Sequence, residues 1–230
     1  MQDSIDIGKA IKALNRHEFK TIVAKDGKDA ATILLDLIDI TAVVGIGDSA
    51  TLRQIGIIDR LQSRGTSVIN PFIGAYNRDT AITCLLADIF LTGANAITQD
   101  GKIVDIDGAG NRIAGTIYGP ETVIIVVGRN KIVRTVEDAF SMIKNCIAPY
   151  HAKTMGYEPP CTKTGTCVDC QSDKRVCRIE TVITRKPMYS DVYIIIIDED
   201  LGLSWDPEWS PERIKKIQIA YEDHVWAYGR

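Results

Sequence analysis

The sequence lacks a membrane-length apolar run, a basic leader and an excess of positive charge. Its longest apolar runs, at 123–127 and 192–197, have the length of strands, whereas a membrane helix needs about 20 apolar residues. The first residues contain acids, without the basic and apolar regions of a secretory signal. The net charge of −3 argues against a broad nucleic-acid surface. We therefore expect a cytoplasmic protein that binds neither membrane nor nucleic acid.

The familiar catalytic motifs are also missing. The sequence contains no nucleophile elbow, P-loop or H-E-x-x-H motif, and no internal repeat. Its three histidines, His17, His151 and His224, are isolated. His151 lies shortly before a cysteine-rich segment and could approach it, although we expect it at the surface. These absences leave open whether the protein is an enzyme.

What is present is an alternation of β-rich and helical segments. Helical spacing of apolar residues predicts helices at 7–19, 29–40, 51–63, 78–87 and 135–153. Continuous or β-branched runs predict strands at 41–46, 67–70, 89–98, 103–106, 122–127, 179–185 and 192–197. The alternation indicates an α/β fold with a mostly parallel sheet flanked by helices.

The chain is expected to form one main domain with two attachments. Residues 1–206 would form the α/β domain, with a cysteine-rich loop at 159–178 inserted in it. Residues 207–230 form an aromatic tail, predicted to be helical from Pro211 with Ser210 as its N-cap. The aromatic residues near this end could anchor an interface, as in a homo-oligomer, or pack on their own domain: Trp205, Trp209, Tyr221, Trp226 and Tyr228.

Four of the six cysteines gather in the inserted loop. Cys161, Cys167, Cys170 and Cys177 have the spacing C-x5-C-x2-C-x6-C. Thiolates select zinc, Cu(I) or iron–sulfur clusters, whereas structural cysteines prefer the core to a hydrophilic loop. Cys84 and Cys146 lie in predicted helices and are expected in the core. The four loop cysteines are therefore the candidate metal ligands.

The spacing favours an iron–sulfur cluster over zinc. Structural zinc sites with four cysteine ligands usually present two short pairs, and here only Cys167 and Cys170 form such a pair. The wider outer spacing suits a larger centre, such as a 4Fe-4S cluster. Zinc, reduced structural cysteines and adventitious disulfides remain the alternatives. The spacing differs from the bacterial ferredoxin run, so it does not establish an electron-transfer chain.

Two glycine-rich segments follow predicted strands. Gly45, Gly47, Asp48 and Ser49 connect a buried strand to a helix, where backbone amides can bind phosphate or carboxylate. The acid expected about 20 residues on in a dinucleotide fingerprint is replaced by Asn70. The alternative is a tight turn in which Asp48 or Ser49 caps the helix.

The second segment supplies the rest of the candidate pocket. Asp107, Asn111 and Arg112 could offer an acceptor, an amide and a cation to a small anion at the strand ends. The alternative is a surface turn, because Asp-Gly is common in turns.

Four ordered segments, at 44–56, 87–98, 107–113 and 119–128, together with 130–133, resemble the LUD (lactate-utilisation) domain family. The similarity extends over about 5–203 and is closest to short members with the four-cysteine loop inside the domain. The resemblance implies a fold like that of ribose-phosphate isomerase and CoA transferases. It also implies a place in lactate or organic-acid redox metabolism, with a redox partner protein. It supplies no catalytic residues.

The leading hypothesis is a LUD-family iron–sulfur protein that binds a small anionic metabolite at its glycine-rich loops, in an accessory or catalytic role. Two alternatives remain: a non-redox transferase or isomerase with a structural zinc, and a binding or assembly module without catalysis.

Overall fold

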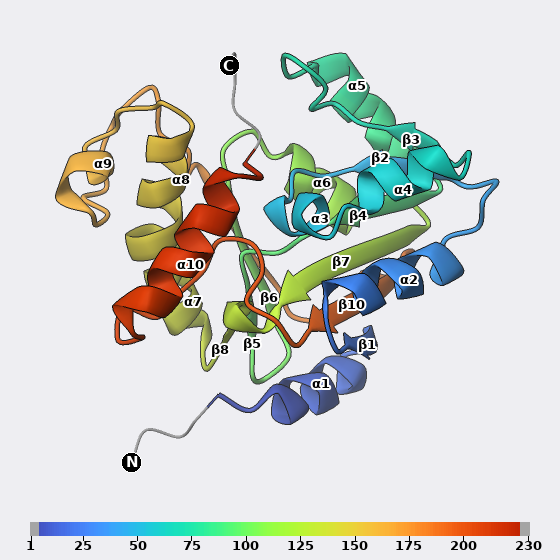
Figure 1. Cartoon of the computed structure of the whole chain (residues 1–230), viewed down its shortest axis with the longest axis horizontal. Helices are drawn as coiled ribbons and strands as arrows, with labels where there is room; N and C mark the ends of the chain where they lie inside the picture. Colours follow the sequence, from blue (N-terminus) through green and yellow to red (C-terminus); the bar gives the residue numbers. More distant parts are fainter. Residues whose placement is uncertain (1–4, 226–230) are drawn as a thin grey trace.

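A computed structural model describes residues 5–225 of the protein. Six parallel strands form the central sheet, in the order β1, β10, β7, β4, β2, β3 (Figure 1). Their bounds are β1 Lys20–Ala24, β2 Val43–Ile46, β3 Ser67–Ile69, β4 Ile89–Thr92, β7 Thr122–Gly128 and β10 Asp191–Ile197. The architecture is mixed α/β with a parallel sheet flanked by helices, which confirms the predicted fold class.

A smaller sheet lies beside the first, in the order β8, β5, β6, β9. Its bounds are β5 Ala96–Thr98, β6 Ile103–Asp107, β8 Ile132–Val133 and β9 Ile179–Ile183. β5 pairs with β8 in parallel and with β6 antiparallel, and β9 pairs antiparallel with β6. The strand predicted at 89–98 is therefore two strands of different sheets, because the chain turns at 93–95.

Helices cover both faces of the central sheet. Their bounds are α1 Ile7–Arg16, α2 Gly27–Leu37, α3 Ala50–Gln54, α4 Ile57–Ser63, α5 Arg78–Thr83, α6 Asn111–Ile117, α7 Val136–Met142, α8 Ala148–Thr154, α9 Cys161–Thr164 and α10 Pro211–Glu222. A π-helical turn at Ile143–Ile147 joins α7 to α8. Two 3₁₀ turns lie at Cys84–Leu86 and Arg129–Lys131.

Successive side chains of β7 point to opposite faces of the central sheet and pack against different layers. Ile124 and Val126 pack with α2, α3 and α4. Val123, Ile125 and Val127, on the opposite face, pack with α1 and the small sheet. Side chains buried on both faces explain why the parallel strands read as continuous apolar runs.

A third core joins the small sheet to the C-terminal helices. Ala96 and Val104 of the small sheet pack with Ile143 of the π-helical turn and with Ile217 and Tyr221 of α10. Figure 1 shows α10 lying along α7 and α8. Ser210 accepts a hydrogen bond from the Arg213 amide, as predicted for the N-cap of this helix.

Other expected elements differ in detail. The helix predicted at 51–63 is divided at Gly56, whose φ of 64° is left-handed. The strand β1 and the helix α6 were not predicted. β1 is an edge strand with one fully buried residue, so it lacks a continuous apolar pattern.

Candidate functional site

A cavity of about 450 Å³ lies where the strands β2, β4 and β6 end. The loops that follow these strands form one wall, α8 and Tyr221 of α10 form another, and residues 173–176 of the cysteine-rich loop close a third side. Parallel sheets commonly bind ligands at the carboxyl ends of their strands. The cavity is therefore the candidate binding pocket.

Five of the seven predicted pocket residues line this cavity: Asp48, Ser49, Asp107, Asn111 and Arg112. Gly45 and Gly47 are not in its lining. A side-chain carbon at Gly45 would lie 2.8 Å from the Cys84 side chain, and one at Gly47 would lie 2.5 Å from the Thr92 hydroxyl. The Gly47 amide donates to the Leu91 carbonyl. These two glycines allow β2 to pack closely against its neighbours.

The loop after β2 is engaged mainly within the protein. The Asp48 carboxylate pairs with Arg53 at 2.7 Å. The Ser49 hydroxyl accepts from the Leu52 amide and so caps α3, as the turn alternative predicted. Asp107 accepts from the amides of Gly108 and Ile113, at the start of α6. Asn111, by contrast, has no side-chain hydrogen bond to any residue of 5–225, which leaves its amide available to a ligand.

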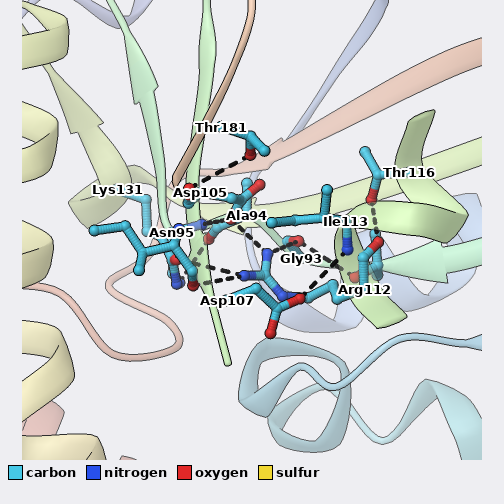
Figure 2. A network of polar contacts seen from close by, with 12 residues as sticks. Gly93, Ala94, Asn95, Asp105, Asp107, Arg112, Ile113, Thr116, Lys131 and Thr181 are labelled. Carbon is cyan, nitrogen blue, oxygen red and sulfur yellow. Dashed lines mark hydrogen bonds and ion pairs between the residues drawn. The ribbon is translucent and has the colours of Figure 1, made fainter. Parts of the chain in front are cut away.

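Arg112 is the centre of a buried polar network (Figure 2). Its guanidinium pairs with Asp105 and donates to the carbonyls of Gly93 and Ile106 at 3.3 and 3.2 Å. The Asp105 carboxylate also accepts a hydrogen bond from the backbone amide of Asn95. Burial raises the pKa of the Asp105 carboxyl, and the adjoining guanidinium offsets part of that shift. The network holds the ends of β4 and β6 together beneath the pocket.

Lys131, which sequence reasoning missed, lies beside this network. It follows β7 in a 3₁₀ turn, is only 7% exposed, and donates from Nζ to the Ala94 carbonyl at 2.8 Å. Within residues 5–225, no carboxylate lies within ion-pair distance of its ammonium. Burial, together with the positive charge of Arg112, lowers its pKa to about 8. Only its place in the family-like segment 130–133 could have drawn attention to it.

His151 and Tyr221 line the opposite wall. The His151 Nδ1 lies 2.5 Å from the Tyr221 hydroxyl, which joins α8 to α10. Burial lowers the pKa of His151 and raises that of Tyr221, so the imidazole is neutral and the phenol protonated near pH 7. We expected His151 at the surface, but the chain folds it into the pocket wall, one turn after the π-helical segment.

The cysteine-rich loop has its own internal contacts. All four thiols are free and partly exposed. Burial raises the pKa of the Cys161 thiol, and the proximity of the other three thiols adds to this shift. Arg175 donates to the carbonyls of Cys177 and Cys170. Four thiols with a basic neighbour have the donor chemistry of a soft-metal centre.

The four thiols do not lie close enough together to coordinate one metal ion. Among residues 5–225, no group of three or more His, Cys, Asp or Glu side chains is spaced to hold a metal ion. A metal at this loop would therefore need the four sulfur atoms to move closer together.

The loop and the pocket share a boundary. Lys174, Arg175 and Val176 line the cavity. The Arg178 amide donates to the Asp107 carbonyl at 2.9 Å. A side-chain carbon at Gly108 would lie 3.1 Å from the Val176 carbonyl, so glycine allows the loop to approach. The cysteine-rich loop is thus attached to the same turn that carries Asp107.

The C-terminal aromatic residues pack inward where they are described. Trp205 is 9% exposed, contacts the Tyr150 ring edge-on and belongs to the same core as Tyr221. Trp209 stacks on the Arg213 guanidinium. Trp226 and Tyr228 lie outside the described residues. Trp205 and Tyr221 are therefore part of their own domain. No helix in 5–225 has the length and apolar character needed to cross a membrane.

The profile of the LUD domain matches residues 7–197, which is most of the chain. The protein therefore belongs to the LUD domain family, as the sequence motifs indicated. No curated protein matches the chain.

Two solved structures are similar in outline. A DUF162 family protein from Deinococcus radiodurans is 15% identical, with a TM-score of 0.47 over 83% of this chain and 95% of its own. Ribose 5-phosphate isomerase A from Methanocaldococcus jannaschii is 13% identical, with a TM-score of 0.37 over 83% of this chain and 84% of its own.

Proposed function

We propose that this LUD-family protein binds a small anionic metabolite, a carboxylate or a phosphate ester, in the pocket beside Arg112 and Lys131. We further propose that an iron–sulfur cluster lies next to this pocket, held by Cys161, Cys167, Cys170 and Cys177. The spacing of the four cysteines favours a 4Fe-4S cluster. The protein would serve organic-acid redox metabolism, such as lactate utilisation, together with a redox partner protein.

One observation carries the anion proposal: Lys131 is a buried ammonium without an ion-paired carboxylate in 5–225, whereas the neighbouring Arg112 is paired with Asp105. An uncompensated buried charge is costly. A bound anion would supply the missing negative charge, and Asn111 and Lys174 offer further donors in the same cavity.

Proton uptake on binding tests this proposal. At pH 8 about half of Lys131 is deprotonated, because its pKa is about 8. An anion beside it raises that pKa, so binding should take up as much as about half a proton per chain. Titration calorimetry with lactate and with inorganic phosphate, each in two buffers of different ionisation enthalpy, measures this uptake and distinguishes the two anion classes.

Matched variants sharpen the result. Lys131→Met should weaken binding roughly 10- to 100-fold, as expected for a lost charge-assisted hydrogen bond, and should abolish proton uptake. The exposed Lys215 of α10 lies outside the pocket. Lys215→Met should therefore change neither the affinity for the anion nor the proton uptake. Absence of binding by lactate and phosphate alike would contradict the anion proposal.

Two properties of the cysteine-rich loop support the cluster: its four thiols are suitable metal ligands, and the loop contains no buried residues of its own. From Cys161 to Glu180 no residue is buried, so apolar packing does not fix its conformation. When bound, a cluster would supply one-electron chemistry beside the pocket. The chain's own contribution is to hold the ligand with Arg112 and Lys131 and to orient the loop through Arg175.

Metal and acid-labile sulfide, measured per chain on anaerobically purified protein, test the cluster. Iron and sulfide in equal, near-integer amounts are expected. Zinc near one per chain without sulfide would favour the non-redox alternative with a structural zinc. A colourless preparation without iron would contradict the cluster.

A further inference from the structure

We infer that Lys131 is an amine nucleophile that forms an imine with an anionic carbonyl compound, of which a 2-oxo acid is the simplest class. The inference rests on the proposed anion pocket and adds a covalent step to it. No other lysine of the described chain combines burial in the pocket with the lack of a carboxylate partner.

The surroundings of Lys131 favour the neutral amine that such chemistry needs. Its stem is enclosed, because a side-chain carbon at Gly202 would lie 2.8 Å from Lys131 Cε. The positive charge of Arg112 acts on it, and a neighbouring cation or an apolar pocket is what activates amine nucleophiles in enzymes. The lowered pKa has the same two causes.

The hydrogen bond at Nζ fixes the nitrogen without blocking it. Nζ donates to the Ala94 carbonyl at 2.8 Å. After loss of one proton the amine retains N–H bonds, so it keeps this interaction while its lone pair becomes free. Ala94 and Lys131 both line the cavity, so a ligand there can meet this lone pair.

The reaction balances without any oxidant or reductant. The nitrogen lone pair attacks the carbonyl carbon and the C=O π pair moves to oxygen. The oxygen then takes up one proton and the nitrogen loses one, which gives the neutral carbinolamine. The hydroxyl takes up a second proton and leaves as water while the nitrogen lone pair forms the C=N bond of a protonated imine. Oxygen therefore gains two protons, of which nitrogen supplies one and solvent the other.

In this inference His151 carries these protons across the cavity. It lines the same cavity, and its Nδ1 is held by Tyr221. No residue of 5–225 is hydrogen-bonded to its Nε2. A neutral imidazole can accept the proton from nitrogen and return it to the departing hydroxyl.

The anionic group of the substrate follows from the cations that remain. Once Lys131 is neutral, Lys174 is a cation that lines the pocket without a carboxylate partner in the described chain, whereas the charge of Arg112 is matched by Asp105. Lys174 therefore favours a carbonyl compound with a carboxylate over a neutral ketone of equal size.

Reductive trapping tests the inference. The full chain is incubated at pH 8 with pyruvate and sodium cyanoborohydride, and the labelled lysine is identified by peptide mass mapping. We expect a single reduced adduct at Lys131. Acetone, which has the same number of carbons and no carboxylate, should label Lys131 at least roughly tenfold more slowly.

Two variants separate the imine from simple anion binding. Lys131→Arg keeps a positive charge but has no amine that can form an imine, so the adduct should be lost, and any lactate binding that remains in this variant measures the effect of the charge alone. His151→Gln should bind lactate and label roughly 100-fold more slowly. Mapping of the unaltered protein decides the question even if a variant fails to fold.

The outcomes are distinct. Lactate binding without an adduct at Lys131, or with label spread over exposed lysines, overturns the imine and leaves the proposed function standing. Equal labelling by acetone overturns the anionic substrate class. Absence of both lactate and phosphate binding together with absence of the adduct overturns both proposals.

Discussion

The central sheet and the cysteine-rich loop are stabilised in opposite ways. In β7 and β10 most residues are buried on both faces, and the paired register runs from Asp191 and Thr122 to Ile197 and Gly128. The loop has no buried residue from Cys161 to Glu180. Its backbone carbonyls accept hydrogen bonds from Arg175 and Arg178, and the Cys167 amide donates to the Asn145 side-chain oxygen. Apolar packing therefore fixes the shape of the sheet, whereas hydrogen bonds alone hold the backbone of the loop.

The largest effect is expected from a core truncation. Phe90 is 1% exposed, and its ring lies where side-chain carbons at Gly115 and Gly47 would stand. Phe90→Ala should lower the free energy of unfolding by about 3–5 kcal/mol. Val168→Ala, in the loop and at a half-exposed position, should change it by less than about 0.5 kcal/mol. Chemical denaturation measures both, and similar costs would remove the contrast between the two regions.

Breaking the buried pair beneath the pocket should come next. Asp105→Ala leaves Arg112 buried without its carboxylate and should cost about 3 kcal/mol. Replacing both partners together, with Asp105→Leu and Arg112→Met, should cost less than the single change, because no unpaired charge remains. A double variant less stable than Asp105→Ala would argue that the hydrogen bonds to Gly93 and Ile106 matter more than the charge.

The dependence of the free energy of unfolding on pH should reveal the titration of Lys131. Its pKa falls from 10.5 to about 8 on folding, so the unfolded chain binds more protons between these values and stability rises with pH across that window. Relative to Lys131→Met, the unaltered protein should gain up to about 3 kcal/mol between pH 8 and 10.5. If the difference in free energy of unfolding between the two proteins stays constant with pH, the buried amine of Lys131 does not titrate in this range.

The smallest expected effect on the metal-free fold is Cys170→Ser. Cys170 is partly exposed and outside the three hydrophobic cores, so the metal-free variant should unfold within about 0.5 kcal/mol of the parent. It should nevertheless lose bound metal and become more sensitive to protease between residues 161 and 178. Unchanged metal content would exclude Cys170 as a ligand.

Sequence patterns predicted the parts of this protein that depend on local or periodic signals. Buried strands such as 122–127 and 192–197 read as continuous β-branched runs, and the helix at Pro211 was marked by its Ser210 cap. Asp48, Ser49, Asp107, Asn111 and Arg112 could be grouped because each of their segments follows a predicted strand, and ligands of α/β proteins collect at strand ends. Gly45 and Gly47 lie in the same motif, yet a glycine required for close packing reads the same as one required for a ligand.

Only the tertiary structure decided the rest. The sequence determined the α/β class, the family and the four clustered thiols, because these follow from periodicity, ordered motifs and spacing along one loop. It could not show that Lys131 is buried beside Arg112, that His151 faces the same cavity, or that residues 173–176 close it. Those groups come from segments far apart in the chain, and their protonation depends on burial and neighbouring charge, which exist only once the layers have packed together.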